Sequence, residues 1–301
     1  MIEARAFEPD FLRRLDRLVL GIRRSRTVRI GQRPIGRVQG MGIEPENFKE
    51  YVEGDDLRFL DWNAYARLDE LTIRTYRAER QVEVTVMVDR SASMGLPERD
   101  DKLGLALALG ASLAYVAMAE NDAVRLAAFA AVKNGARLSL TPFHRRRESY
   151  EEFRPFVTGL RAQGRTGLFD AVTEFLRERR SPGVTILISD FLLEPGEFED
   201  ALGRLSAARH ELKVLHVMGE QESQASYPPG LYRIRDTETG AMREVAFGPA
   251  LSEACRRKVN ELRERLREYC LRHAIVYAPA FGARNLETIL ERELPKLGVV
   301  R

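Results

Sequence analysis

The sequence predicts an α/β protein built on a doubly wound, mostly parallel β-sheet of Rossmann-like type, and two observations support this fold class. Short apolar runs bounded by turn residues alternate with helical patterns throughout residues 81–301. Two of the runs, VTVMV at 84–88 and VTILIS at 184–189, are almost continuously apolar instead of apolar at every second position. Strands of that kind are buried on both faces, as in a parallel sheet that helices cover on both sides.

Each expected element follows from a local pattern. A strand at 82–88 precedes 17 residues without a charge at 103–119, which predict a buried helix over about 101–120. The Pro182-Gly183 break sets the start of the strand at 184–189. The other expected strands are 123–130, 136–140, 212–218 and 274–280, and the other expected helices are 147–161, 167–180, 195–209, 249–273 and 284–292.

The helix at 249–273 follows a short hairpin whose turn is TETG at 237–240. Its apolar residues recur every three or four positions, so they lie on one face of the helix. They are Leu251, Cys255, Val259, Leu262, Leu266, Tyr269 and His273. The hairpin and this C-terminal helical extension are assigned to one domain with the sheet, residues 81–301.

The first 80 residues are different in character and are expected to form an N-terminal accessory region. Residues 1–40 hold 10 Arg against four acidic residues and make a basic arm. A GDDLRFLDW segment follows at 54–62, with acidic and basic side chains expected to form local ion pairs. The alternating stretch LTIRTYRAERQ at 71–81 predicts a strand that leads into the main sheet.

Composition sets the expected surroundings. The 48 basic and 45 acidic residues give a net charge of +3, which is no reason to expect that the whole molecule binds nucleic acid or anionic lipid. Cys255 and Cys270 lie on one predicted helix, about 22 Å apart and too far for a disulfide, so the chain is expected to be reduced and cytoplasmic. The N-terminus lacks the pattern of a secretory signal, and the uncharged run 103–119 is interpreted as a core helix because predicted strands closely flank it.

Two carboxylates are predicted to meet at one edge of the sheet. Asp89 ends the strand at 82–88 and Asp190 ends the strand at 184–189. In doubly wound sheets, ligands bind in the crevice beyond the carboxyl ends of the strands. Ser91 and Ser93 follow Asp89 closely, and Thr166 lies in a Gly-bracketed loop just before a helix. Asp89 and the two serines are also the residue types of an ordinary turn, so this stretch alone does not identify a site.

Taken together, the five oxygen-bearing side chains predict a cation site. Hard oxygen ligands suit Mg²⁺, and also Mn²⁺ or Ca²⁺, better than zinc. Two carboxylates would neutralise a divalent cation, three hydroxyls would complete part of an octahedron, and one position would stay open. Such an ion would favour a carboxylate from a partner protein.

The order strand, DRSASM at 89–94, loop threonine and strand-terminal aspartate resembles the metal-ion-dependent adhesion site of von Willebrand factor type A domains. In that family the two serines and the threonine coordinate the metal directly, and the aspartates do so directly or through water. The resemblance implies these roles for Ser91, Ser93, Thr166, Asp89 and Asp190. It also implies a von Willebrand factor type A-like domain that binds proteins.

A second resemblance covers nearly the whole chain. The stretch from Tyr51 to Met94 strongly resembles the bacterial family of domain of unknown function 58, in which Y-x-x-GD-x-x-R-x-x-DW-x-x-x-AR leads directly into the adhesion-type domain. The matching positions are Tyr51, Gly54, Asp55, Arg58, Asp61, Trp62, Ala66 and Arg67. Because members are typically encoded beside MoxR-type AAA+ ATPases, the resemblance implies a non-enzymatic adaptor or scaffold that works with such an ATPase.

Two other functions remain open from the sequence. A phosphoryl-transfer enzyme could use Asp89 as a nucleophile, but haloacid-dehalogenase-type phosphatases carry a second Asp where this chain has Ser91, which cannot act as a general acid near neutral pH. The basic arm at 1–40 could bind nucleic acid or a membrane surface. The chain has no phosphate-binding loop, no G-x-S-x-G elbow and no HExxH motif.

Overall fold

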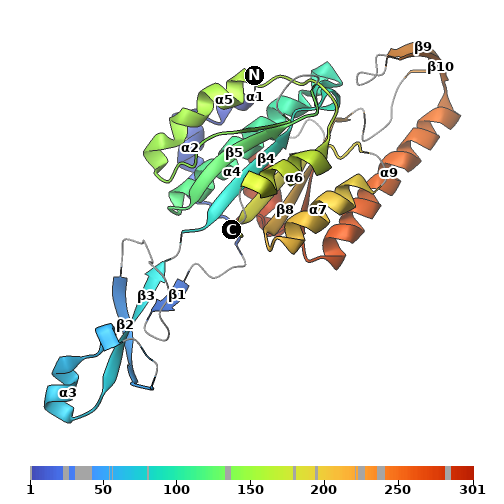
Figure 1. Cartoon of the computed structure of the whole chain (residues 1–301). Helices are drawn as coiled ribbons and strands as arrows, with labels where there is room; N and C mark the ends of the chain where they lie inside the picture. The colour runs from blue at the N-terminus through green and yellow to red at the C-terminus, as the bar shows by residue number, and fades with distance from the viewer. Residues whose placement is uncertain are drawn as a thin grey trace. The chain divides into compact units, whose positions relative to one another are not determined.

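The computed structural model describes residues 2–22, 27–30, 43–53, 55, 57–79, 81–132, 137–178, 181–193, 196–220, 222, 228–235, 241–281 and 286–301. The chain forms two compact units (Figure 1). The larger unit consists of Met1–Ile22 together with Glu83–Arg301, and the smaller one is Arg23–Val82. Each unit has its own β-structure and is described by itself.

The larger unit is built on a six-stranded sheet with the order β11-β8-β7-β4-β5-β6. Its strands are β4 (Glu83–Asp89), β5 (Ala123–Phe129), β6 (Leu138–Leu140), β7 (Val184–Ser189), β8 (Glu211–Met218) and β11 (Val276–Phe281). All neighbours pair in parallel except β5 and β6, so β6 is an antiparallel edge strand. The mostly parallel α/β sheet predicted from the sequence is confirmed.

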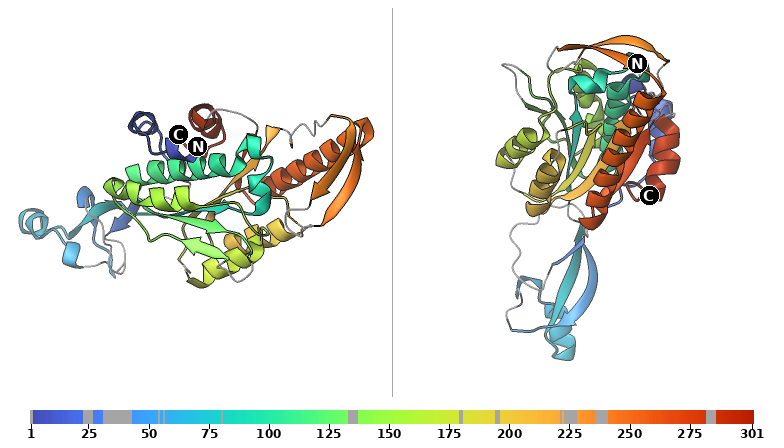
Figure 2. Two further views of the ribbon diagram at one scale, coloured as in Figure 1. Left: turned by 90° about the horizontal axis from the view of Figure 1, so that it is seen from above. Right: turned by 90° about the vertical axis from the view of Figure 1, so that its right-hand side faces the viewer.

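Helices cover both faces of this sheet (Figure 2). The central helix α4 (Lys102–Ala119) packs against one face, and Gly110 allows it to approach Val86 and Val88 closely. Met87, one position between them, faces the opposite side and packs with α6 (Leu168–Glu178), α7 (Glu197–Ala207) and the C-terminal half of α9 (Pro249–Arg272). The alternation of side chains along a strand thus gives β4 two buried faces, which explains its continuous apolar run.

The apolar helix α4 lies inside the unit. By length and composition, the segment Glu98–Ala119 is the one described helical segment that could cross a membrane, but 94% of its most apolar window is buried within the protein. Asp101 adopts a left-handed conformation at the N-cap, and its side chain accepts a hydrogen bond from the N–H of Gly104. A helix that is apolar on all sides is expected at the centre of a two-layered core.

Residues 2–22 belong to the sheet domain, whereas the sequence boundary placed them in the accessory region 1–80. The short helices α1 (Ile2–Arg5) and α2 (Pro9–Leu15) bury Phe7, Phe11 and Leu15 beside α4. The hydroxyl of Tyr150 donates to the carbonyl of Ala6 at 3.0 Å, and the Tyr150 ring stacks on Phe7 with centroids 4.9 Å apart. The sequence analysis assigned residues 1–40 to a basic arm because of their high Arg content, although Phe7, Phe11 and Leu15 recur at the four-residue spacing of a buried helical face.

The smaller unit contains a separate antiparallel sheet with the order β1-β3-β2. Its elements are β1 (Thr27–Ile30), β2 (Ile43–Glu50), the 3-10 turn η1 (Leu57–Phe59), α3 (Trp62–Leu68) and β3 (Thr72–Glu79). The expected strand at 71–81 is β3, which pairs with β1 and β2 and is followed along the chain by β4 of the main sheet. Alternation identified a strand but not its partners.

The GDDLRFLDW segment has local structural roles in this unit. The side chain of Asp61 caps α3 by accepting hydrogen bonds from the N–H groups of Asn63 and Ala64. Asp55 forms an ion pair with Lys49 at 2.5 Å. The predicted local ion pairing is therefore seen for Asp55, while Gly54 and Asp56 lie outside the described residues.

The remaining elements agree with the sequence in position but not always in type. The expected helix 147–161 is a 3-10 segment η4 (Arg147–Phe153) followed by α5 (Arg154–Gly159), with Pro155 in the first turn of α5. The hairpin consists of β9 (Gly230–Arg235) and β10 (Met242–Phe247), and its turn at 237–240 lies outside the described residues. The closing helix is α10 (Leu286–Thr288), the π-helical η5 (Ile289–Glu293) and α11 (Leu294–Lys296). The 3-10 turns η2 (Ala92–Gly95) and η3 (Glu98–Asp100) lie between β4 and α4.

The packing of residues 2–22 on α4 generates a stability prediction. We expect Phe7→Ala to lower the free energy of unfolding of the sheet domain by about 3 to 5 kcal/mol, because Phe7 is only 2% exposed and its removal leaves a cavity. Denaturant unfolding of the whole chain measures this change. Phe48→Ala in the smaller unit is the matched control, since Phe48 is 59% exposed and should change stability by less than about 0.5 kcal/mol. If Phe7→Ala does not change the unfolding transition of the sheet domain, residues 2–22 do not contribute to its core and the assignment to this domain is contradicted.

Candidate functional site

The candidate site lies where β4 and β7 end side by side. Val88 pairs with Ile188 in parallel register, so Asp89 at the end of β4 comes level with Ser189 at the end of β7. Asp190 is the next residue after Ser189. Both Asp89 and Asp190 have no solvent exposure. The register of one strand pair therefore brings the two predicted carboxylates to one buried edge of the sheet.

Hydrogen bonds fix both oxygens of the Asp89 carboxyl group. Its Oδ1 accepts the N–H of Ser91 at 2.8 Å, and its Oδ2 accepts the hydroxyl of Ser189 at 2.6 Å. The Ser189 oxygen in turn accepts the N–H of Phe191 at 3.0 Å. Ser189 was not among the predicted site residues, although a hydroxyl closing an apolar strand is a signal in the sequence. Asp89 is thus held in one orientation.

The two predicted serine ligands lie next to each other. Ser91 is fully buried and Ser93 is partly buried, and their Oγ atoms are 3.0 Å apart. Neighbouring ligands of an octahedral Mg²⁺ with bonds of about 2.1 Å are also about 3.0 Å apart. Met94, in the 3-10 turn that follows, is fully buried and anchors this loop. The 3.0 Å distance between the two Oγ atoms is that of a hydrogen bond, and it also fits two ligands of one cation.

Backbone hydrogen bonds bring the Thr166 loop to the same edge. The carbonyl of Gly164 accepts the N–H of Ala92 at 2.9 Å, and the N–H of Gln163 donates to the carbonyl of Arg90 at 2.8 Å. Gly164 has a positive φ of 77°, and a Cβ atom there would lie 2.5 Å from the carbonyl oxygen of Ala131, so only glycine suits this approach.

Thr166 itself carries an unsatisfied polar atom. Its side chain is 3% exposed, and its Oγ1 has no hydrogen-bond partner in the described part of the chain. A buried hydroxyl without a partner costs about 1 to 3 kcal/mol and calls for an explanation, such as a ligand that it would contact. The orphaned hydroxyl lies in the loop that flanks the Asp89 turn.

A buried lysine neutralises Asp190. Lys102, at the first turn of α4, is 1% exposed, and its Nζ lies 3.0 Å from Asp190 Oδ2 and 2.7 Å from Glu222 Oε1. Asp190 Oδ1 accepts the N–H of Leu192 at 3.2 Å. The sequence prediction missed Lys102 and Glu222. Lys102 was visible as the one charge opening an otherwise uncharged helix, whereas Glu222 is 120 residues away and has no local signal.

Burial and charge set the protonation of this cluster. Burial and, to a lesser extent, the neighbouring charge of Asp190 raise the pKa of Asp89, hydrogen bonds from Ser189 and Ser91 lower it, and the net result is a pKa of about 7. Burial opposes the charge of Lys102, but the carboxylates of Asp190 and Glu222 outweigh burial and raise the pKa of its ammonium group. Burial also raises the pKa of Glu222. With a pKa of about 7, Asp89 in the cation-free site is mostly protonated below neutral pH and loses its proton as the pH rises through 7.

The donor set fits a hard cation in three respects. The two serine hydroxyls have the spacing of neighbouring ligands, the Thr166 hydroxyl has no other partner, and Asp89 carries an unfavourable charge that a cation would stabilise. Searched over the described residues, no group of three or more His, Cys, Asp or Glu side chains is arranged to hold a metal ion. The candidate set has another composition, with two carboxylates and three hydroxyls. Both oxygens of Asp89 and both of Asp190 already accept hydrogen bonds, so the three hydroxyls have fewer competing contacts than the carboxylates.

The family follows from comparison of the sequence with known proteins. A model of the family described as "Protein of unknown function DUF58" matches residues 47–269. The chain belongs to this family. An uncharacterized protein of Mycobacterium bovis, Mb1516, and one of Mycobacterium tuberculosis, Rv1480, are each 30% identical to this DUF58 chain over 223 residues, which cover 73% of this chain and 68% of each relative.

Two solved structures are similar to this DUF58 protein over much of its length. The conserved hypothetical protein BatB from Bacteroides thetaiotaomicron has 17% sequence identity and a TM-score of 0.42, and covers 72% of this chain and 98% of its own. An aerotolerance-related membrane protein from Bacteroides fragilis has 17% identity and a TM-score of 0.39 at the same coverage.

The pKa of Asp89 generates a prediction about pH. Its carboxyl group ionises near pH 7 in the folded chain and near 3.8 when unfolded, so the folded state binds the extra proton between these values. The free energy of unfolding of cation-free wild type should therefore fall as pH rises from about 4 to 7, by at most roughly 4 kcal/mol from this group. Asp89→Asn removes the titration and should gain stability relative to wild type over that window. Both proteins are measured in the presence of a chelator. If wild type and Asp89→Asn show the same dependence of the free energy of unfolding on pH, Asp89 is ionised throughout this range and the prediction is contradicted.

The Lys102 cluster generates a second prediction. Lys102→Met should lower the free energy of unfolding by about 3 to 5 kcal/mol, because it leaves the buried carboxylate of Asp190 without its counter-charge. Arg137→Met is the matched control, since Arg137 and Asp170 form an ion pair on the surface and its loss should cost less than about 1 kcal/mol. Equal losses in the two variants, measured by denaturant unfolding, would contradict the structural role assigned to Lys102.

Proposed function

We propose that this DUF58 protein is a non-enzymatic protein-interaction module whose sheet domain is of the von Willebrand factor type A kind and works with a bound divalent cation. The observation that carries the proposal is the buried Thr166 hydroxyl without a partner, in a loop tied to the Asp89 turn. In a protein that needed no ligand there, a valine would serve better than an unsatisfied threonine.

Each side chain has a defined role in the proposed site. Ser91, Ser93 and Thr166 would hold the cation through their hydroxyls, and Asp89 would supply the negative charge once its proton leaves. Asp190 would contribute its negative charge to the site, while one of its oxygens stays bound to the ammonium group of Lys102. Magnesium is the ion proposed, with Mn²⁺ or Ca²⁺ as alternatives, because the donors are hard oxygen atoms. A bound cation would attract a carboxylate group of a partner protein.

Two observations weigh against the alternatives. For phosphoryl transfer by the haloacid-dehalogenase-type mechanism, a general acid would be needed at position 91, and Ser91 cannot supply a proton near neutral pH. For binding through the arm, Arg5, Arg13 and Arg14 form ion pairs with Glu287, Asp10 and Glu291. Residues 1, 23–26 and 31–40 of the arm lie outside the described residues.

The partner proposed is a MoxR-type AAA+ ATPase in the cytoplasm, with this chain as its adaptor or scaffold. This part of the proposal rests on the family resemblance in the sequence and on the carboxylate that the open cation position would take.

The proposed partner is tested by capturing proteins from native lysate in the presence of magnesium, with wild type and Asp89→Ala compared. Recovery of an AAA+ ATPase with wild type alone supports the partner, and equal recovery with Asp89→Ala removes the cation from the interaction.

The cation itself is tested by a variant of nearly equal shape. Thr166→Val should leave the cation-free protein as stable as wild type or about 1 kcal/mol more stable, because it removes an unsatisfied buried hydroxyl. Magnesium at 100 times its dissociation constant should stabilise wild type by about 2.7 kcal/mol and Thr166→Val by much less. Thermal unfolding with and without magnesium measures both effects.

Thr173→Val in α6 is the matched control. The Thr173 hydroxyl donates to the carbonyl of Phe169 at 2.8 Å, so its loss should destabilise the protein and leave the magnesium response intact. If Thr166→Val keeps the full response to magnesium while Asp89→Ala loses it, the ion binds without the threonine. If wild type itself does not respond, the proposed function fails.

A further inference from the structure

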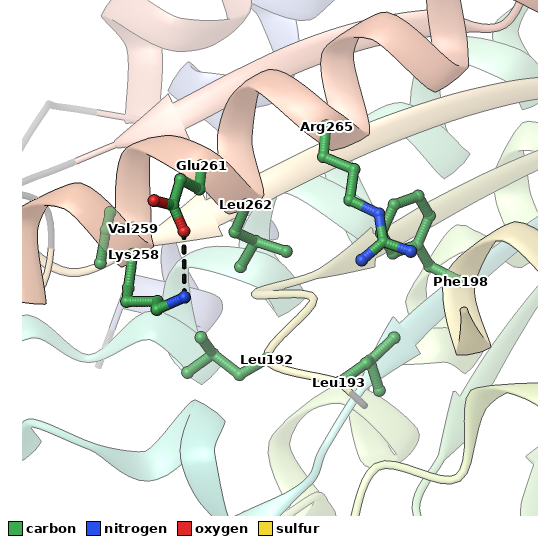
Figure 3. Close-up of a pocket in the computed structure, with 8 residues that line it drawn as sticks. All are labelled: Leu192, Leu193, Phe198, Lys258, Val259, Glu261, Leu262 and Arg265. Carbon is green, nitrogen blue, oxygen red and sulfur yellow. Dashed lines mark hydrogen bonds and ion pairs between the residues drawn. The ribbon is translucent and has the colours of Figure 1, made fainter. Parts of the chain in front are cut away.

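An apolar groove opens next to the candidate site. It has a volume of about 460 Å³ and lies between α9 and the turn that follows Asp190 (Figure 3). Its apolar lining comes from Leu192 and Leu193 of the turn, Phe198 of α7, and Val259 and Leu262 of α9. The groove belongs entirely to the sheet domain.

The groove exists because the apolar face of α9 is longer than the core beneath it. Leu266 and Cys270, in the C-terminal half of the helix, are buried against the sheet. Val259 and Leu262, nearer the N-terminus, are only partly covered, and Leu192 opposite them is 43% exposed. Within the described part of the chain, no side chain fills the space between them. Covering such a surface is favourable by about 25 cal/mol per Å².

The groove and the candidate site share one turn of the chain. The N–H of Leu192 donates to Asp190 Oδ1 at 3.2 Å, so the wall of the groove begins at a carboxylate of the site. Asp190 and Leu193 are three residues apart, which is at most about 11 Å along the chain. An extended peptide spans that distance in about three to four residues.

The charged residues that line the groove are Lys258, Glu261 and Arg265, two basic and one acidic. Arg256 and Arg257 precede Lys258 on α9 and are exposed, and Arg256 pairs with Glu253. Lys258 pairs with Glu261 at 3.1 Å, and Arg265 pairs with Glu199 while its guanidinium lies 5.4 Å from the centroid of the Phe198 ring. Arg257 has no ion-pair partner among the described residues. Basic side chains around an apolar hollow suit an acidic segment that carries an apolar side chain.

We propose that the groove receives a bulky apolar side chain, of the size of leucine or phenylalanine, from the same partner segment that supplies a carboxylate to the cation. The occupant is an acidic peptide segment of a protein partner, with the carboxylate and the apolar residue no more than about four positions apart. This inference rests on the proposed function, which it extends from the cation to the identity of the segment bound. The shared turn, the open apolar face of α9 and the excess of basic side chains on this part of α9 all support it.

The experiment uses a library of random 12-residue peptides, selected on the full-length chain with and without magnesium. Wild type should enrich peptides that hold an acidic residue no more than about four positions from a large apolar residue, in magnesium only. Leu192→Asp should keep the preference for the acidic residue but lose the apolar one, and an enriched peptide should bind this variant about tenfold to a hundredfold more weakly. Val259→Asp is a second groove variant in case the first does not fold.

Leu271→Asp is the matched control, because Leu271 lies on the same helix and is 77% exposed away from the groove. It should bind the enriched peptides as wild type does. Asp89→Ala should lose all magnesium-dependent enrichment.

The outcomes separate the two proposals. Acidic peptides with no apolar preference, equally bound by Leu192→Asp, would overturn the groove and keep the cation site. Apolar peptides enriched without magnesium would show a groove that acts independently of the cation and would overturn the coupling. Absence of any magnesium-dependent enrichment, with the variants folded, would overturn both.

Discussion

Two buried carboxylates at adjacent strand ends are the constraint on which the larger unit depends. Asp89 and Asp190 are both fully buried, and the parallel register of β4 and β7 holds them at neighbouring strand ends. Like charges in a buried setting strongly disfavour joint ionisation. The chain meets this constraint with a proton on Asp89 and the ammonium group of Lys102 on Asp190. Ser189, the Ser91 amide and the turn at Leu192 supply the hydrogen bonds that hold the two groups in place.

The same constraint determines how the proposed cation would bind. A divalent ion would have to displace the proton of Asp89, so cation binding and proton release would be one event. With Asp89, Asp190, Lys102 and Glu222 all charged, the occupied site would be neutral, because the charges of Lys102 and Glu222 cancel. In the proposed complex, the open coordination position of the cation, and not a net positive charge of the site, would attract the partner carboxylate.

The sequence was sufficient wherever a local pattern decides the structure, and insufficient wherever distant segments decide it. Apolar runs identified every strand of the main sheet, and the strand-terminal positions of Asp89 and Asp190 followed from them. Lys102 and Glu222 were missed because their pairing depends on a segment 120 residues away. The strand at 71–81 was predicted, but the three-stranded sheet that it forms with β1 and β2 was not, since alternation indicates a half-buried strand and not its neighbours. Residues 2–22 were placed in the wrong unit because the Arg content outweighed the spacing of Phe7, Phe11 and Leu15.

The apolar face of α9 shows how a pattern can be read correctly and still leave its purpose open. The spacing from Leu251 to His273 predicted one continuous face, and such a face is normally read as core. Only the C-terminal half, around Leu266 and Cys270, is fully buried against the core, whereas Val259 and Leu262 line a groove whose other wall includes Leu192 and Leu193. The residues that end the core on this side are therefore the residues that begin the candidate site. A face that the fold leaves uncovered at that point has a reason to be apolar only if something outside the described chain covers it.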